Sequence, residues 1–165
     1  MNIKYYYFID EFNKNEIEKL STQISLIYRN YNNKNDPNEL KKLVIHCKIN
    51  RRKVYISNNL KDAIKYNFDG LYIPAFQKHL RFQNITKKSL EIIGSAHNAI
   101  ELKIKEMQGC SCIFLSPIFK NNKNKKFLDV IKTNLLKKMT KNKIVLLGGI
   151  NQKTLKRSKL CAPSG

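Results

Sequence analysis

The segment IIGSAHNAIELKIKEMQGCSCIFLSPIF, residues Ile92–Phe119, is the most informative part of the chain for its architecture. Two short apolar runs, in the stretches Leu90–Gly94 and Ser111–Ser116, flank a region with helical spacing, and each has the length of a buried strand. Asn98 followed by Glu101 fits a capping box, which predicts that a helix begins there. The segment therefore predicts one strand–helix–strand unit of a parallel sheet.

The same alternation runs along the whole chain. The expected strands are Ile3–Ile9, Ile24–Tyr28, Lys53–Ser57, Gly70–Pro74, Leu90–Gly94, Ser111–Ser116 and Lys143–Gly149. Helices are expected between them, over Asn13–Gln23, after Pro37, over Leu60–Tyr66, after Asn98, over Phe127–Met139, and last over Asn151–Leu160. Their inward faces are expected to carry Leu40, Leu43, Val44 and Cys47, then Ile100, Ile104 and Met107, then Phe127, Val130, Ile131, Leu135 and Met139.

Strands that alternate with helices form parallel βαβ units with right-handed crossovers. No Gly-rich dinucleotide fingerprint follows the first strand, so we expect a TIM (β/α)8 barrel rather than a doubly wound sheet. The chain stops at Gly165, about where an eighth strand should begin, and an open barrel would expose unpaired strand edges. We therefore expect a single domain over residues 1–165 that lacks the eighth strand and final helix, as a truncated or frameshifted product would.

The chain is strongly basic, with 32 Lys and Arg against 12 Asp and Glu and a formal net charge of +20. Such an excess attracts phosphate-rich partners. The lysines are scattered, apart from the segment Lys120–Lys126, which favours a solvated surface over nucleic-acid binding. No apolar run approaches the roughly 20 residues of a membrane span, and the N-terminus lacks the pattern of a signal peptide. We expect a cytoplasmic protein.

Four cysteines, at positions 47, 110, 112 and 161, raise the alternatives of a metal site and of buried thiols. Cys110 and Cys112 are two residues apart in a strand-like run, so their side chains share one face. No second Cys or His pair has ligand spacing, which leaves a zinc site incomplete. Buried reduced thiols are the preferred interpretation.

In a barrel of this type the active site lies at the C-terminal ends of the strands. The expected ends are rich in hydroxyls, amides and glycine, which suits phosphate better than acid–base hydrolysis; they include Arg29, Ser57–Asn59, Pro74–Gln77, Gly94–His97, Ser116–Pro117 and Gly148–Asn151. The Gly148–Gly149 pair either lets backbone N–H groups approach an anion before a helix or makes a plain tight turn. His97 is either a general base or part of the helix cap, and we favour the cap.

These segments resemble the thiamine phosphate synthase/TenI superfamily. Ile92–Phe119 is similar to the fifth and sixth βα units of that family, whose turn carries Gly, Ser and His. Ser57–Pro74 and Ile144–Asn151 resemble two further family segments in the same order, and the likeness covers most of the chain from about Ile24. It implies a (β/α)8 barrel and a transferase of thiamine biosynthesis, which joins hydroxymethylpyrimidine pyrophosphate to thiazole phosphate and releases pyrophosphate.

The resemblance also implies roles for individual residues. The family's positions for substrate and pyrophosphate are occupied by Arg29, Asn58, Ser95, Lys123 and Lys125. Those for the thiazole phosphate are occupied by Gly149 and Ile150. Asn58 and Gln77 stand where the family has aspartates that hold Mg²⁺. The family implies this ion, but an amide in place of a carboxylate removes the charge that holds it, so no metal ligand is assigned.

Two functions follow from the resemblance. The leading expectation is a thiamine phosphate synthase-type transferase, based on the order of the resembling segments and on Arg29, Ser95 and Gly149. Pro117 stands where the TenI branch has its catalytic histidine, and proline is what the synthase branch has there. The alternative is a non-catalytic or regulatory TenI-like protein that binds thiazole or thiamine phosphate. Both imply phosphorylated small molecules as ligands, and both leave a homo-oligomer open. We expect no membrane partner, and the scattered lysines do not favour a nucleic-acid partner.

Overall fold

The computed structural model describes residues 5–31, 35–80, 90–120 and 127–148. The chain forms two compact units, one made of residues 1–72 and 87–91 and the other of residues 73–86 and 92–165. One barrel domain over the whole chain stays a prediction. Within the described ranges, no helix has both the length and the apolar content that crossing a membrane requires.

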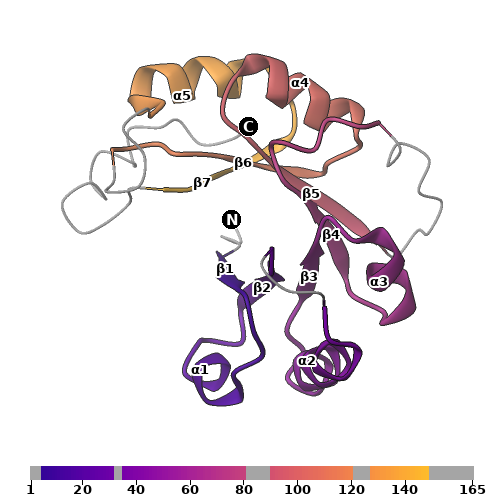
Figure 1. Cartoon of the computed structure of the whole chain (residues 1–165). Helices are drawn as coiled ribbons and strands as arrows, with labels where there is room; N and C mark the ends of the chain where they lie inside the picture. The colour runs from indigo at the N-terminus through magenta and orange to yellow at the C-terminus, as the bar shows by residue number, and fades with distance from the viewer. Residues whose placement is uncertain (1–4, 32–34, 81–89, 121–126, 149–165) are drawn as a thin grey trace. The chain divides into compact units, whose positions relative to one another are not determined.

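The first unit is a parallel sheet with helices between its strands. Its elements are β1 (Tyr5–Ile9), α1 (Lys14–Glu18), β2 (Ile24–Tyr28), α2 (Pro37–Ile49), β3 (Val54–Ser57), α3 (Leu60–Lys65) and β4 (Gly70–Ile73, the last residue belonging to the second unit). Each strand pairs in parallel with the next in the sequence, and α1 and α2 lie on the same side of them (Figure 1). Parallel strands in sequence order are typical of a barrel wall, whereas a doubly wound sheet reverses its order.

Helix α2 shows why the first unit follows its sequence closely. The Asp36 side chain caps the helix by accepting a hydrogen bond from the Asn38 N–H, and Pro37 occupies the first turn. The four residues expected on its inward face are buried, as predicted: Leu40, Leu43, Val44 and Cys47. Capping and apolar spacing therefore agree over the whole of this helix.

The second unit is a smaller parallel sheet. Its elements are β5 (Glu91–Ala96, the first residue belonging to the first unit), α4 (Ala99–Met107), β6 (Cys112–Leu115), α5 (Asp129–Lys138) and β7 (Lys143–Leu146). β6 pairs in parallel with β5 and with β7, and both helices lie on the same side (Figure 1). The expected cap is confirmed, because Asn98 Oδ1 accepts a hydrogen bond of 2.9 Å from the Glu101 N–H.

The inward face expected for α4 is wrong. The helix buries Leu102 and Lys105, whereas Ile100 is 74% exposed and Met107 is 44% exposed. The reason lies in β5, where a Cβ on Gly94 would come within 2.8 Å of Lys105 Cδ. The missing side chain of Gly94 thus leaves room for the lysine stem against the sheet.

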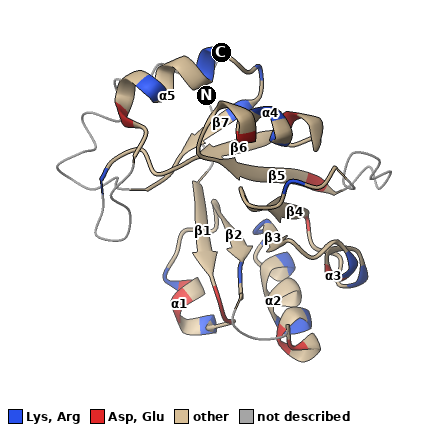
Figure 2. Cartoon of the chain, turned by 45° about the horizontal axis from the view of Figure 1, so that its top comes forward, with Lys and Arg blue, Asp and Glu red and all other residues tan. Residues whose placement is uncertain are grey.

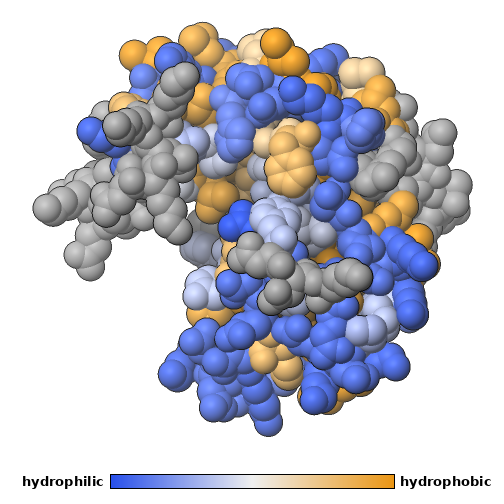
Figure 3. Space-filling view, in the orientation of Figure 1, coloured by the Kyte–Doolittle hydropathy of each residue, from blue (hydrophilic) through white to orange (hydrophobic). Residues whose placement is uncertain are grey.

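The inward face expected for α5 is also wrong. The helix begins at Asp129, which has a φ of +58°, and it turns Thr133 and Leu136 to the interior. The apolar residues that remain exposed are Phe127, Ile131, Leu135 and Met139. Figure 3 shows apolar side chains along the top of the view, over α4 and α5.

Several boundaries differ from those expected. α1 covers only Lys14–Glu18 instead of Asn13–Gln23, and β5 extends to Ala96, so that Gly94 and Ser95 lie inside the strand. The expected last helix, Asn151–Leu160, and the place of an eighth strand lie outside the described residues.

The predictions for the cysteines and the basic residues agree with the structure within the described residues. Cys47, Cys110 and Cys112 are free and buried, which confirms the expected thiols at three positions, and Cys161 lies outside the described residues. Burial raises the pKa of Cys47 and of Cys110 to about 12. Lys and Arg are spread over the helices of both units (Figure 2).

Candidate functional site

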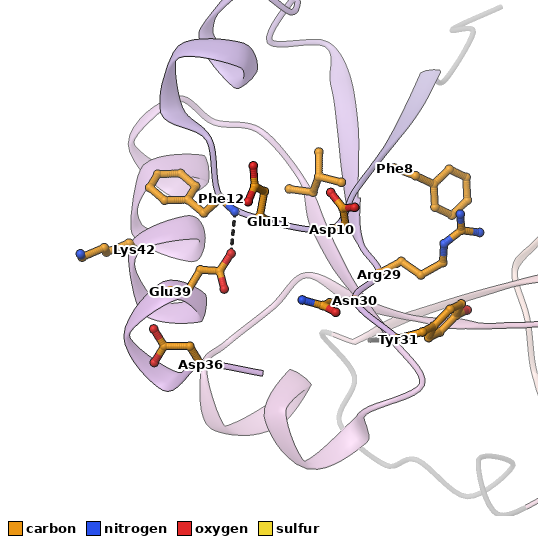
Figure 4. Close-up of a pocket in the computed structure, with 11 residues that line it drawn as sticks. Phe8, Asp10, Glu11, Phe12, Arg29, Asn30, Tyr31, Asp36, Glu39 and Lys42 are labelled. Carbon is orange, nitrogen blue, oxygen red and sulfur yellow. Dashed lines mark hydrogen bonds between the residues drawn. The ribbon is translucent and has the colours of Figure 1, made fainter. Parts of the chain in front are cut away.

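Arg29 comes directly after β2 and has a well-defined position. Its backbone N–H donates a 2.7 Å hydrogen bond to Ile9 O at the end of β1. Its guanidinium carbon lies 4.5 Å from the ring centroid of Phe8 and 5.6 Å from that of Tyr31 (Figure 4). These are cation–π distances. Because no described carboxylate forms an ion pair with Arg29, its planar donor fork can bind an anion.

Arg29 lines a pocket of about 780 Å³ at the ends of β1 and β2, called here the β1–β2 pocket. Its lining comprises Phe8, Ile9, Asp10, Glu11, Phe12, Arg29, Asn30, Tyr31, Asp36, Glu39 and Lys42. Four of the chain's 12 acidic residues are in this set, beside two cations. Figure 4 shows Arg29 with the two aromatic rings on one side, and Glu11, Glu39 and Asp36 on the other.

Two of the four carboxylates hold the local structure. Glu39 accepts hydrogen bonds from the Phe12 N–H at 2.6 Å and from the Tyr28 hydroxyl at 3.2 Å. Burial, assisted by Glu39, raises the pKa of Tyr28 to about 12, so this hydroxyl stays protonated as a donor. Asp36 caps α2. The remaining two carboxylates, Asp10 and Glu11, accept no hydrogen bond from other described residues, and they leave the pocket with negative as well as positive charge.

A second pocket, of about 450 Å³, lies beside the first at the ends of β2 and β3, and is called the β2–β3 pocket. It is lined mainly by amides and hydroxyls: Tyr28, Asn30, Tyr31, Asn35, Ser57, Asn58, Asn59 and Asp62. Asn58 has a φ of +54°, and its N–H donates to Tyr72 O at 2.8 Å. The Tyr31 hydroxyl and Ser57 Oγ are 3.3 Å apart, which joins the two pockets. The structure thus brings Arg29 and Asn58 into one region, as the strand-end rule predicts.

The side chains around Asn58 do not offer the ligands of a Mg²⁺ site. Asp62 is the one carboxylate of the described lining, and it accepts hydrogen bonds from Asn59 Nδ2 at 2.6 Å and Asn35 Nδ2 at 3.1 Å. No group of three or more His, Cys, Asp or Glu that could hold a metal occurs in the part of the chain that the structure describes. Mg²⁺ in proteins is held by carboxylates and substrate phosphates, so neutral amides are poor substitutes.

The other expected site residues have different positions. Ser95 lies within β5, opposite Phe114, and is only 4% exposed, so it does not extend beyond the strand end. Gln77 follows β4, and its backbone carbonyl accepts hydrogen bonds from Lys105 Nζ and Gln108 Nε2. Its side-chain Oε1 accepts from the His79 N–H at 3.3 Å, within its own turn. The remaining expected residues, Lys123, Lys125, Gly149 and Ile150, lie outside the described residues.

A third pocket, of about 780 Å³, belongs to the second unit and is called the β6–β7 pocket. Its lining comprises His97, Asn98, Ala99, Ser116, Pro117, Phe127, Leu128, Lys132, Leu135, Leu136, Leu147 and Gly148. His97 takes part in the helix cap, as favoured from the sequence, because its backbone N–H donates to Glu101 Oε2 at 2.7 Å. Its ring Nδ1 contacts Ser116 O.

The sequence interpretation missed the acidic residues of the β1–β2 pocket. Asp10 and Glu11 directly follow the first strand, and an acidic pair at a strand end in so basic a chain was the available signal. Glu39 had no such signal, since it reaches Phe12 across 27 residues of sequence.

Comparison with known proteins supports the fold. No family model matches the sequence, and a search of curated proteins finds no match. Among solved structures, the thiamine phosphate pyrophosphorylase from Pyrococcus furiosus is similar at 15% identity and a TM-score of 0.66, over 86% of this chain and 69% of that protein. FabK from Thermotoga maritima is similar at 10% identity and a TM-score of 0.66, over 87% of this chain and 49% of that protein.

A U32 peptidase is similar at 10% identity and a TM-score of 0.64, over 96% of this chain and 75% of that protein. The chain thus spans between about half and three quarters of the length of these proteins. Proteins with such different names share the architecture, so the likeness carries no activity. What the comparisons support is an α/β fold like that of TIM barrels.

Proposed function

We propose that the chain is a thiamine phosphate synthase-type transferase whose pyrophosphate substrate binds at the ends of β1 and β2. The observation that carries the proposal is Arg29, which is exposed at a strand end, stacked against Phe8 and without an ion pair among the described residues. An arginine fork held in place before the ligand arrives loses less side-chain freedom on binding a phosphate.

The mixed charge of the β1–β2 pocket supports a transfer reaction over binding of a simple anion. In the proposed reaction, the bond between the pyrimidine methylene carbon and the pyrophosphate oxygen breaks, and the oxygen keeps the electron pair. The carbon becomes cationic, and the thiazole nitrogen lone pair then forms the new C–N bond. Arg29 would stabilise the departing pyrophosphate, while Asp10 and Glu11 would stabilise the cationic carbon.

A second candidate function is a non-catalytic protein that binds thiazole or thiamine phosphate. It is favoured by the lack of good Mg²⁺ ligands in the described lining of the β2–β3 pocket. Asn58 stands where the family has a carboxylate, and Asp62 accepts hydrogen bonds from two amides. With the full chain, thiamine phosphate formation from the two phosphorylated substrates should be measured with and without Mg²⁺. Turnover supports the transferase, and saturable binding without turnover supports the binding protein. Neither turnover nor binding would overturn both.

Replacing Arg29 with Ala is expected to weaken pyrophosphate binding tenfold or more. A charge-assisted hydrogen bond to phosphate contributes on the order of 1.5–3 kcal/mol, and the truncation removes the fork without touching the core. Isothermal titration with pyrophosphate measures the change. Arg51→Ala is the matched control, because it removes an equal charge from an exposed position outside the pocket lining. Equal affinities for Arg29→Ala and the unmodified chain would contradict the assignment.

A further inference from the structure

The β6–β7 pocket has the apolar walls of a small-molecule site. Its apolar lining residues are Phe127, Leu128, Leu135, Leu136 and Leu147. Leu135 is 57% exposed and Phe127 is 40% exposed, so large apolar side chains remain partly in contact with solvent. A volume of about 780 Å³ lies within the range of ligand pockets, roughly 300–1,000 Å³.

The base of this pocket is closely packed backbone. Gly148 follows β7 with a φ of +88°, and a Cβ there would lie 3.0 Å from Pro117 Cα. The Leu128 N–H donates to Pro117 O at 2.9 Å, and the Ile118 N–H donates to Leu147 O at 3.1 Å. These contacts join the ends of β6 and β7 to the start of α5, so the pocket is built from backbone that is already fixed.

The charged side chain of the described lining is positive. Lys132 lines it and makes no ion pair with any residue in the described ranges. The described lining includes no Asp or Glu, in contrast to the four of the β1–β2 pocket. The His97 ring is held by contacts of its Nδ1 with Ser116 O and, at 3.4 Å, with Ser116 Oγ.

We propose that the β6–β7 pocket binds a small molecule with an apolar body and one anionic head group, such as an aromatic carboxylate. The leucines and Phe127 remove the body from water, and Lys132 attracts the head group where no carboxylate of the described lining opposes it. The proposal goes beyond the transferase function, which rests on Arg29 in the first unit.

Three probes test the two halves of this ligand. Isothermal titration of the full chain with 1-naphthoate is expected to show one saturable site. 1-Naphthalenemethanol keeps the body without the charge, and inorganic phosphate keeps a charge without the body. Each is expected to bind at least tenfold more weakly than 1-naphthoate. Equal affinity for the alcohol, or no saturable binding of naphthoate, would overturn the proposal.

Matched variants on α5 locate the site. Leu135 and Ile131 are one helical turn apart and both exposed, but only Leu135 lines the pocket. Leu135→Gln is therefore expected to weaken naphthoate binding at least fivefold, and Ile131→Gln is expected to leave it unchanged. Equal effects of the two substitutions would contradict the site.

The charged half has its own pair of variants. Lys132→Gln is expected to weaken naphthoate binding at least threefold, whereas Lys138→Gln, at an exposed position outside the lining, is expected to have no effect. This pair keeps the test decisive if Leu135→Gln fails to fold. Arg29→Ala should leave naphthoate binding intact, which separates this site from the pyrophosphate site proposed at Arg29. Loss of naphthoate binding in a folded Arg29→Ala variant would overturn the proposal that the naphthoate site is separate from Arg29.

Discussion

Replacing Lys105 with Met is expected to remove a pH-dependent gain in stability. The free energy of unfolding of Lys105→Met minus that of the unmodified chain should fall by on the order of 3 kcal/mol between pH 8 and pH 10.5. Lys105 is 0% exposed, and its Nζ donates to Gln77 O at 2.7 Å and Gln108 Oε1 at 2.8 Å, both neutral acceptors. Burial lowers the pKa of Lys105 from 10.5 to about 8, although Cys110 and Glu101 oppose the shift.

The sign of the effect follows from proton binding. Between pH 8 and pH 10.5 the unfolded chain keeps the Lys105 proton and the folded chain has lost it. The unfolded state therefore binds more protons, and the stability of the folded state rises with pH across this window. Below pH 8 the buried ammonium lowers the stability by its full amount. Met keeps the apolar stem and does not titrate, so the variant lacks this rise.

The unmodified chain alone would not show the effect clearly. Burial raises the pKa of Cys47, Cys110 and Tyr28 to about 12, and it raises that of Tyr55 as well. These groups lower the stability once the pH passes their ordinary values of 9.0 and 10.0, because only the unfolded chain then loses their protons. The difference between variant and unmodified chain cancels the contributions of Cys47, Tyr28 and Tyr55, and that of Cys110 apart from its coupling to Lys105.

Urea unfolding at pH 7, 8, 9 and 10 measures that difference. Lys138→Met, at an exposed position on α5, is the control and is expected to show no such trend. A difference between Lys105→Met and the unmodified chain that stays constant over these pH values would contradict the buried ammonium.

The burial of Lys105 marks the limit of prediction from apolar spacing. Ile100, Ile104 and Met107 fit a helical face, but what orients α4 is a long-range need. The carbonyls of Gln77 and His79 require donors, which Lys105 and Gln108 supply across about 30 residues. Local periodicity contains no information on such pairs. In α2, by contrast, cap and periodicity agree, and the sequence predicts both its start and its buried face.

The candidate site, too, could be predicted from the sequence only in part. The strand-end rule predicted the region of Arg29 and Asn58, because strand ends follow from local sequence. The rule did not predict the acidic lining of the β1–β2 pocket, which forms only when the first turn of α2 brings Asp36 and Glu39 to the end of β1. Asp10 and Glu11 could have been predicted from the sequence, whereas tertiary packing adds Asp36 and Glu39 to the charge of this pocket.

Replacing Arg52 with Met is expected to lower the free energy of unfolding by on the order of 3 kcal/mol. Arg52 is 4% exposed, and its guanidinium donates to the carbonyls of Ile17 at 3.3 Å, Leu20 at 2.8 Å and Ile24 at 3.1 Å. These carbonyls lie from the end of α1 to the start of β2. Met fills much of the space but leaves all three without this donor, which is the costly side of burying a polar group.

Guanidinium and ammonium differ in this respect. A guanidinium is more weakly hydrated than an ammonium and has five N–H donors, so the three carbonyls offset much of the burial of Arg52, although its buried Nε has no hydrogen-bond partner among the described residues. Arg52→Lys should therefore be of intermediate stability, since one ammonium cannot reach three carbonyls in the same geometry. Arg51→Met, at the exposed neighbouring position, should have a free energy of unfolding within about 0.5 kcal/mol of that of the unmodified chain, measured by unfolding in guanidinium chloride. A similar midpoint for Arg52→Met and Arg51→Met would mean that water replaces the guanidinium at these carbonyls, and that the start of β2 does not depend on it.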